Sequence, residues 1–327
     1  MPPFPLSDHC DGTHFFNPGT QPQARSFGDL PRWWRDRLIY RKFSPWPRSV
    51  PPPRTPVLPE GIPARQLAVT FLGHSTFLLQ LPGLNVITDP VFATHAGPLG
   101  LFGPKRIRPA ALRLGELPRI DVVLLSHNHY DHLDLAALRW LARHHRPALV
   151  TTLGNRTWLQ RRGVERVTEL DWWQSHHPAP DLEAICTPAQ HFTARTPWDR
   201  CRTLWGGFML RTAAGLVYFA GDSGWGPHFA GIHARLGAPR LALLPIGAYE
   251  PRWFMIPVHV NPDEAVRAHV ALGARQSIGM HFGTFNLTDE AIDEPARALA
   301  VAREAHGVAA ADFDTLDFGE TRMMAAN

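Results

Sequence analysis

The sequence predicts a layered α/β domain in which helices lie outside two sheets. Apolar segments rich in Val, Ile, Leu and Phe recur from about residue 66 onwards. Some are joined by tight turns such as Pro82-Gly83, and others are separated by helical segments. Hairpins mixed with strand–helix alternation are typical of this architecture. The strands are expected within residues 66–81, 84–92, 120–126, 148–152, 183–189, 203–210, 215–223, 240–247 and 275–282.

Two segments carry particular signals. Residues 120–126 (IDVVLLS) form a continuous apolar run, as a strand buried on both faces does. Residues 134–145 have helical spacing. A further helix is expected to start at Asn261-Pro262-Asp263-Glu264, with a capping Asn, Pro at the first position and acids against the helix dipole.

The composition is that of an ordinary globular protein. The chain has 327 residues, of which 44% are hydrophobic and 19% charged, and no stretch approaches the roughly 20 apolar residues of a membrane-spanning helix. The N-terminus lacks the features of a secretory signal, and three scattered cysteines argue against a disulfide scaffold. We therefore expect a cytoplasmic protein. The formal charge of +4 only mildly favours anionic partners.

The first 60 residues differ from the rest. They hold 13 of the 32 prolines. Because proline fits neither a helix interior nor a central strand, we expect residues 1–60 to form an arm packed on a domain of residues 61–327, with one short helix near 30–41. For Trp33 and Trp34 there are two interpretations: aromatic packing of the arm, which we favour, and a membrane-interface patch.

A histidine–aspartate cluster follows the buried 120–126 segment. His127, His129, Asp131 and His132 place four potential metal ligands within six residues. The first two can face one ion and the last two a second, and zinc accepts both imidazole and carboxylate. Solvated loop residues are the alternative, but they rarely concentrate in this way. The cluster leaves both ions short of ligands, so further ligands are expected at other strand ends.

Three further candidates stand where strands are expected to end: His191, Asp222 and His281. Sites in open α/β sheets are built at the carboxyl ends of strands. His191 would complete a three-histidine site with His127 and His129. His281 would join Asp131 and His132, and Asp222 would bridge the two ions.

Longer strings carry a resemblance to a known family. These are FLGHSTFLLQ, TDPVF, GPKRIRP, SHNHYDHLD, PAQHF, FAGDSG, IGAYEPRWFM and HVNPDEAVRAH…MHFGTF, with a weaker echo in THFFNP. Over about residues 66–290 the sequence resembles the metallo-β-lactamase superfamily. Within it, the chain resembles the branch of N-acylphosphatidylethanolamine-hydrolysing phospholipase D and its bacterial relatives.

The resemblance implies a four-layer αββα sandwich with a di-zinc site. It assigns the seven ligands as above and implies cleavage of phosphodiesters, phospholipids among them. Tyr130 and His259 match positions that contact the lipid phosphate. Val258 departs from the family's glutamine, which removes a polar contact. Manganese and iron accept the same ligands.

Two further polar residues lie outside this ligand set. Asp89 is either an acceptor that orients a ligand histidine or the cap of a turn before Pro90. His74 is expected to be a hydrogen-bonded core histidine.

The mechanism expected from this site is hydrolysis by a hydroxide shared between two zinc ions, on the order of 3.5–4 Å apart, that attacks phosphorus. Asp222, His259 and Tyr130 are its candidate catalytic residues. The alternatives are a lactonase or amidase on the same fold, a nuclease of the superfamily, and a non-enzymatic scaffold. We expect a small-molecule or phospholipid substrate, no nucleic acid, and room for peripheral membrane contact. The sequence leaves the oligomeric state open.

Overall fold

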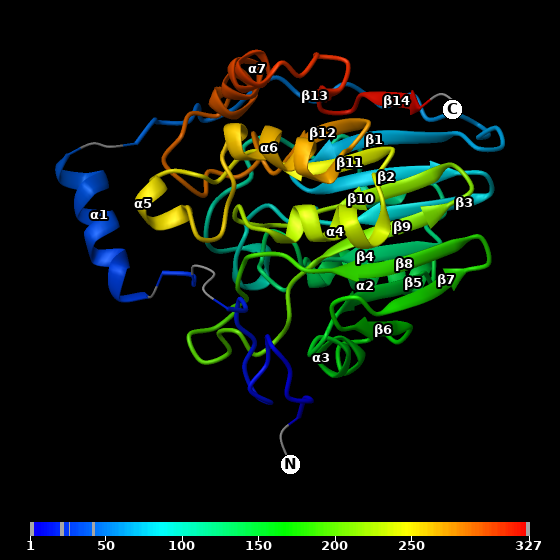
Figure 1. The fold of residues 1–327 in the computed structure, drawn as a ribbon, viewed down its shortest axis with the longest axis horizontal. Coiled ribbons are helices and arrows are strands. Elements are labelled where there is room, and N and C mark those ends of the chain that lie inside the picture. The colour runs from blue at the N-terminus through cyan, green and yellow to red at the C-terminus, as the bar shows by residue number, and fades with distance from the viewer. Residues whose placement is uncertain (1–2, 20–22, 26, 41–42, 325–327) are drawn as a thin grey trace.

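The computed structural model describes residues 3–19, 23–25, 27–40 and 43–324. Its core is a pair of seven-stranded sheets (Figure 1). The strands are β1 (Leu67–Gly73), β2 (Thr76–Leu81), β3 (Leu84–Thr88), β4 (Val122–Leu125), β5 (Ala148–Thr152), β6 (Val167–Leu170), β7 (Ser175–Ala179), β8 (Leu182–Thr187), β9 (Gly207–Thr212), β10 (Gly215–Phe219), β11 (Leu241–Pro245), β12 (Gln276–Met280), β13 (Phe313–Thr315) and β14 (Thr321–Met324). The α-helices are α1 (Leu30–Ile39), α2 (Leu135–His144), α3 (Arg156–Gln160), α4 (His228–Leu236), α5 (Arg252–Met255), α6 (Pro262–Leu272) and α7 (Glu294–His306).

Both sheets are mixed, and each divides into an antiparallel and a parallel part. The first has the order β14-β1-β2-β3-β4-β5-β6, and its pairs are antiparallel up to β3 and parallel from β3 to β6. The second has the order β13-β12-β11-β10-β9-β8-β7, with parallel pairs from β13 to β10 and antiparallel pairs beyond. The parallel strands of both sheets present their carboxyl ends at one edge of the sandwich.

Helices cover the outer faces of the sheets, so the expected αββα arrangement is confirmed. Residues of β4 alternate between two apolar clusters. Val122 and Leu124 belong to the cluster that fills the space between the sheets and extends to α4, α6 and α7. Val123 and Leu125 belong to a second cluster, with α2 residues, on the outer face of the first sheet. This double burial explains why residues 120–126 are apolar without interruption.

Both helices expected within residues 61–327 form, and the start expected at Asn261 is borne out in detail. Asp134 caps α2, because its side chain accepts hydrogen bonds from the amides of Ala136 and Ala137. Asn261 caps α6 in a reciprocal pair with Glu264, and Pro262 takes the first helical position. In α2 the cap fixes the start of the helix directly after the histidine–aspartate cluster.

The N-terminal segment touches the sandwich at several points. Phe15 is buried in the intersheet cluster. The Nε2 atom of His9 lies 2.8 Å from Oδ1 of Asp171. The Trp33 indole donates to Asp289 at 2.7 Å, whereas Trp34 is 58% exposed. The division at residue 60 stays a prediction.

Within the described residues, no helix is both long and apolar enough to cross a membrane.

Candidate metal centre

The candidate ligands converge at the edge where the parallel strands end. Three chain segments of the first sheet lead there: the β1–β2 turn with His74, the residue after β3 (Asp89), and the loop after β4. From the second sheet come His191, four residues after β8, Asp222, three after β10, and His281, directly after β12. The strands before His191 and Asp222 are therefore shorter than the sequence suggested, and short loops carry these two ligands.

The first ligand group contains His127, His129 and His191. The Nε2 atom of His127 lies 2.9 Å from Nδ1 of His129, and Nε2 of His191 lies 3.2 Å from that same Nδ1. Ligands at zinc bond lengths of 2.0–2.1 Å in a tetrahedron lie about 3.3 Å apart. The three nitrogens therefore fit the corners around one ion.

The second ligand group contains Asp131, His132 and His281, and His74 lies in the same cluster. The Nε2 atoms of the two histidines are 3.2 Å apart, and Oδ2 of Asp131 lies 3.5 Å from His132 and 3.3 Å from His281. These separations match the same tetrahedral edge. The expected pairing of Asp131 and His132 with His281 is thus the one that the structure brings together.

Asp222 stands between the two groups. Its Oδ2 atom is 3.0 Å from His132 Nε2 and 3.1 Å from His281 Nε2, and 3.9 and 3.8 Å from those of His127 and His191. The side chain is buried, and its Oδ1 atom has no hydrogen-bond partner in the part of the chain that the structure describes. A buried carboxylate oxygen left without a partner is costly unless a cation binds it. The donor set and this orphaned oxygen both fit two divalent ions.

Outer hydrogen bonds fix which nitrogen of His127, His132 and His191 faces the centre. The Nδ1–H of His132 donates to Asp89 Oδ2 at 2.6 Å. Asp89 also accepts from the Ser126 amide and hydroxyl, and that hydroxyl lies 2.9 Å from Nδ1 of His127. Of the two interpretations of Asp89, the structure supports the acceptor that orients a ligand histidine.

His191 is oriented by two segments far away in the sequence. Its Nδ1–H donates to the Val258 carbonyl at 2.9 Å. Its backbone is bracketed by Asn17, whose side chain accepts from the His191 amide at 3.2 Å and donates to the His191 carbonyl at 3.3 Å. The THFFNP segment thus contains a residue, Asn17, that contacts the backbone of a candidate ligand. The sequence alone did not single out Asn17.

The electrostatics of the two groups differ. Burial lowers the pKa of His129 to about 3 and that of His191 to about 4. Burial also opposes charge on His281, but Asp222 and Asp131 outweigh it and raise its pKa to about 9. In the same way, carboxylates raise the pKa of His132 well above its usual value. Without a metal, His132 and His281 therefore hold protons, and these protons place positive charge where a cation would bind. Metal binding releases them.

His259 is buried beside both ligand groups. Its ring centroid lies 5.1 Å from that of His191 and 5.3 Å from that of His281. Burial holds the pKa of His259 well below its usual value, and its Nδ1 finds no partner among the described residues. The structure therefore places a neutral imidazole against the centre, close enough that His191, Asp222 and His259 form a further group able to hold an ion.

Tyr130 is held by Arg195, a residue that the sequence analysis missed. The Tyr130 hydroxyl donates to the Arg195 carbonyl at 3.0 Å, and the guanidinium lies 3.9 Å from the centroid of the Tyr130 ring. The Arg195 Nη1 atom donates to the carbonyls of Asn128 and Leu133 at 2.7 and 3.0 Å. Arg195 thus braces the loop that carries His129, Asp131 and His132 near both of its ends. No sequence motif around Arg195 indicates this role.

His74 is buried and hydrogen-bonded, as expected. Its partner is Asp131, whose Oδ2 lies 3.1 Å from Nε2. His74 and His281 both adopt left-handed backbone conformations, with φ of 58° and 62°. Such conformations cost of order 1 kcal/mol or more per non-glycine residue and concentrate at functional sites.

Comparison with known proteins gives this centre a family. The family model described as "Beta-lactamase superfamily domain" matches residues 84–282. The chain is 39% identical over 267 residues to N-acyl-phosphatidylethanolamine-hydrolyzing phospholipase D 1 of Caenorhabditis elegans, covering 78% of this chain and 75% of that one. It is also 30% identical over 226 residues to a UPF0173 metal-dependent hydrolase of Koribacter versatilis, covering 67% and 85%.

Solved structures share the fold. The metallo hydrolase Igni18 from Ignicoccus hospitalis superposes with a TM-score of 0.61 at 22% identity, over 80% of this chain and all of that one. An isothiocyanate hydrolase from Delia radicum gut bacteria also gives 0.61, at 18% identity, over 79% and 98%. The sandwich, the family match and the identity to curated relatives agree, and the chain belongs to the metallo-β-lactamase superfamily of metal-dependent hydrolases.

Proposed function

We propose that this protein is a di-zinc phosphodiesterase that acts on phospholipids such as N-acylphosphatidylethanolamine. The observation that carries the proposal is the position of Asp222, whose Oδ2 faces both three-ligand groups. Support for the phosphodiester comes from the 39% identity to a phospholipase D of that specificity in C. elegans.

Each ligand residue has a defined part in this proposal. His127, His129 and His191 hold one ion, Asp131, His132 and His281 hold the other, and Asp222 contributes to both. Bound zinc supplies a water of lowered pKa and neutralises charge that develops on the phosphoryl oxygens. Asp89 and the Val258 carbonyl keep Nε2 of His132 and His191 directed inward.

His259 and Tyr130 are the proposed substrate contacts. The free Nδ1 of His259 suits a hydrogen bond to a phosphate oxygen or to the leaving oxygen. The Tyr130 hydroxyl could also donate to a phosphate oxygen, but it must first break its hydrogen bond to the Arg195 carbonyl. Val258 adds an apolar, buried side chain next to His259, so recognition of the phosphate depends on the imidazole rather than on an amide at that position.

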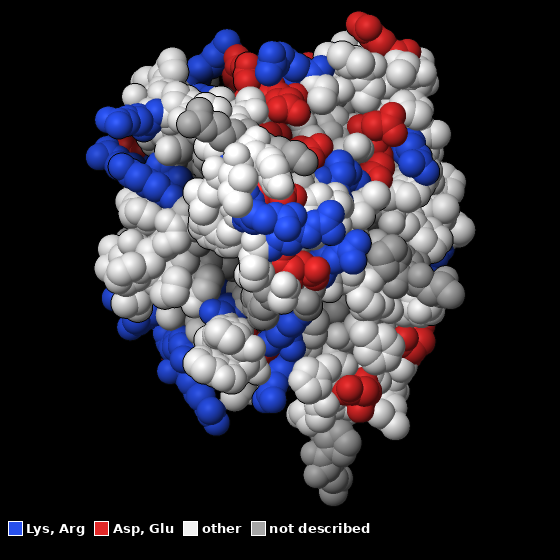
Figure 2. Space-filling model, turned by 90° about the vertical axis from the view of Figure 1, so that its left-hand side faces the viewer, with Lys and Arg blue, Asp and Glu red and all other residues white. Residues whose placement is uncertain are grey.

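The outer surface near this edge suits a lipid substrate. Helix α1 lies at the left of Figure 1, beside the end of the sheets where the ligands converge. It exposes Trp34, Leu38 and Ile39 by 58%, 72% and 66%. Figure 2 looks onto this side of the molecule and shows basic side chains spread among uncharged ones, with acidic side chains beside some of them. Exposed aromatic and aliphatic side chains next to arginines are typical of surfaces that lie on anionic membranes.

A parallel assay tests the proposal. The zinc-loaded protein is incubated with bis(p-nitrophenyl) phosphate, with N-acylphosphatidylethanolamine in mixed micelles, and with a lactone and an anilide. We expect chelator-sensitive release of phosphatidic acid from the lipid and of p-nitrophenol from the diester. Turnover of the lactone or the anilide, without turnover of either phosphodiester, would contradict the proposal and would indicate a carbonyl hydrolase that uses the same centre.

A further inference from the structure

A basic cavity lies at the opposite edge of the first sheet from the metal centre. The centre is built at the carboxyl ends of β3 and β4, whereas this cavity adjoins the amino ends of β4, β5 and β6. The cavity contains Arg119, three positions before β4, and Arg166, directly before β6. It also contains His144, the last residue of α2, and His145 and Arg146, which follow α2 and precede β5. The cavity is therefore a separate feature of the fold and shares no residue with the candidate centre.

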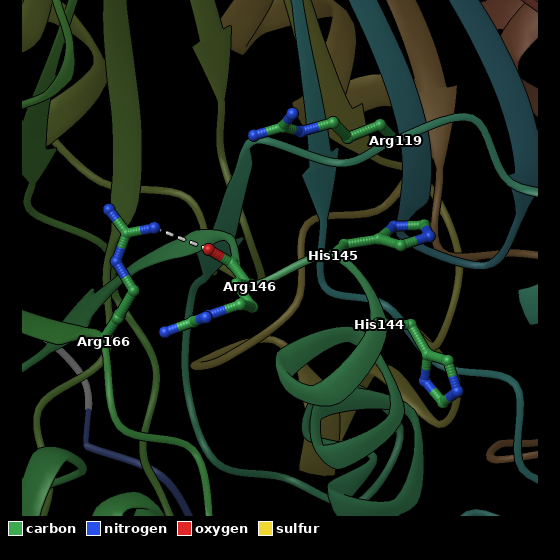
Figure 3. A pocket seen from close by; sticks show the side chains of 5 residues that line it. All are labelled: Arg119, His144, His145, Arg146 and Arg166. Carbon is green, nitrogen blue, oxygen red and sulfur yellow. Dashed lines mark hydrogen bonds between the residues drawn. The ribbon is translucent and has the colours of Figure 1, made fainter.

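Every residue that lines this cavity is an arginine or a histidine. The cavity has a volume of about 650 Å³ and is lined by Arg119, His144, His145, Arg146 and Arg166. Figure 3 shows the guanidinium groups of Arg119, Arg146 and Arg166 reaching toward the same space from three separate segments. Three permanent positive charges around one hollow repel one another, and an anion bound there would relieve the repulsion.

Few carboxylates offset this charge. The Asp121 Oδ1 atom lies 3.3 Å from Nε of Arg119. Over the described ranges of the chain, neither Arg146 nor Arg166 forms an ion pair. Some exposed arginines elsewhere find acids, such as Arg113 with Glu116 and Arg211 with Glu183, and others among the described residues do not. The cavity differs from them in that three guanidinium groups share one hollow.

Several of the cavity side chains are also held in place. The Nη1 atom of Arg166 donates to the Arg146 carbonyl at 2.6 Å, the bond drawn as a dashed line in Figure 3. Because the Ile120 amide donates to Nδ1 of His145 at 3.1 Å, the proton of the neutral His145 ring must be on Nε2. His144 stacks on Trp140 with ring centroids 4.3 Å apart. Fixed donors lose less conformational entropy when they bind an anion.

A second hollow continues from the first. It has a volume of about 310 Å³ and shares Arg146 and Arg166 with the basic cavity. Apolar side chains line much of it, among them Val123, Leu138 and Leu141, together with Arg143 and Glu165. A ligand with a charged head and an apolar body could therefore fill both.

We propose that the two hollows form a binding site for an organic phosphate, a phosphate monoester with an apolar substituent. The dianion would lie among the guanidinium groups of Arg119, Arg146 and Arg166, and the substituent would lie against the aliphatic side chains. A phosphate monoester carries close to two negative charges at neutral pH and three acceptor oxygens, which suits several arginine forks at once. This site is independent of the hydrolytic centre and of its proposed substrate.

Calorimetry with phenyl phosphate and inorganic phosphate as probes tests the proposal on the zinc-loaded protein. We compare the wild type with the double variant R146Q/R166Q and with R211Q, which removes an exposed arginine on β9 of the other sheet. We expect the double substitution to raise the Kd for phenyl phosphate at least tenfold and R211Q to leave it unchanged. An equal Kd in the wild type and the double variant would overturn the proposed site. Phenyl phosphate that still binds to the double variant with the same affinity would be bound at the metal centre.

Two further readouts keep the test decisive. In amide NMR spectra, phenyl phosphate should shift the signals of Ile120 and Arg146, and shifts confined to residues 127–132 would contradict the proposal. Inorganic phosphate should bind more weakly than phenyl phosphate, and equal affinity would overturn the role of the apolar hollow. If loss of the Arg166–Arg146 bond lowers the melting temperature, R119Q repeats the test without breaking that bond.

Discussion

The two ligand groups of the candidate centre are similar in shape but are held in different ways. In the first group, outer contacts are neutral: the Ser126 hydroxyl on His127, and the Val258 carbonyl and Asn17 side chain on His191. In the second group, His132 rests on the buried carboxylate of Asp89, and Asp131 accepts from His74.

This difference has a physical consequence. A neutral hydrogen bond contributes roughly 1 kcal/mol to the position of a histidine, whereas a bond to a charged group contributes about 1.5–3 kcal/mol. A buried carboxylate also makes the imidazole a better donor to a cation. The second group should therefore depend mainly on Asp89, and the first on several weak contacts, one of which also leads to Asp89 through the Ser126 hydroxyl.

The largest effect is expected at Asp222, the residue that the two ligand groups share. Asp222→Ala removes an oxygen from both groups and should reduce the metal content from about two ions per chain to nearly none. Turnover should fall by at least the roughly 10²–10³-fold that loss of one charge-stabilising group costs. Metal analysis and the diester assay measure both, with Asp181→Ala, an exposed acid between β7 and β8, as the control. Retention of two ions would remove Asp222 from its bridging position.

His259 lies beside both groups and belongs to neither in the proposal. His259→Ala should therefore leave about two ions bound while kcat/KM falls by about 10²–10⁴-fold, the usual range for a positioned acid or a proton donor. Metal content and steady-state kinetics on one preparation separate the two effects. Loss of an ion from this variant would make His259 a ligand instead of a substrate residue.

Asp89→Asn tests the dependence of the second group on a single carboxylate. Asparagine keeps the size and an acceptor oxygen but removes the charge, so the affinity of the second ion should fall by about 10–100-fold. The first ion, which Asp89 reaches only through the Ser126 hydroxyl, should weaken much less. Titration with a competing chelator resolves the two ions. If both ions weaken equally, the two groups are not supported separately, and the comparison fails.

Arg195→Met tests the brace of the loop that carries ligands of both groups. The variant loses the bonds from the guanidinium to the Asn128 and Leu133 carbonyls while most of the side-chain volume stays. We expect kcat/KM to fall about tenfold, the effect of roughly 1.4 kcal/mol of lost positioning, and Arg211→Met to have no effect. Partial recovery in Arg195→Lys is expected, since one donor remains. An unchanged kcat/KM in Arg195→Met would show that the loop keeps its shape without the brace.

Asn17→Ala should have the smallest effect. It removes two neutral bonds to the His191 backbone, and the Val258 carbonyl still orients the ring. The affinity of the first ion should therefore decrease only about fivefold, corresponding to roughly 1 kcal/mol. A chelator titration that shows a hundredfold loss would mean that the first group, too, depends on one residue.

The parts of the fold that the sequence predicted are those with a strong local signal. β4 shows as a continuous apolar run because both of its faces are buried, and α6 shows through its cap. β6, β7, β13 and β14 were missed. β7 is an edge strand with the sequence SHHPA, largely open to solvent, and β13 has three residues. Strands that bury little apolar surface leave little pattern to detect.

The candidate site divides in the same way. The seven expected ligands could be named because ligand-type residues cluster after apolar strands. Arg195 and Asn17 could not be, because each acts on the backbone of another segment, and such contacts depend on how distant loops meet. Asp89 is intermediate: its position before Pro90 allowed two interpretations, and only the 2.6 Å bond to His132 favours one.

Metal counting on the wild-type protein tests the central claim most directly. The protein is purified without chelator, its metal content is measured by mass spectrometry, and hydrolysis of bis(p-nitrophenyl) phosphate is followed before chelation, after chelation and after zinc is restored. The account predicts about two zinc ions per chain and turnover that disappears and returns with them. One ion or none per chain in protein that binds zinc no further on titration would contradict it.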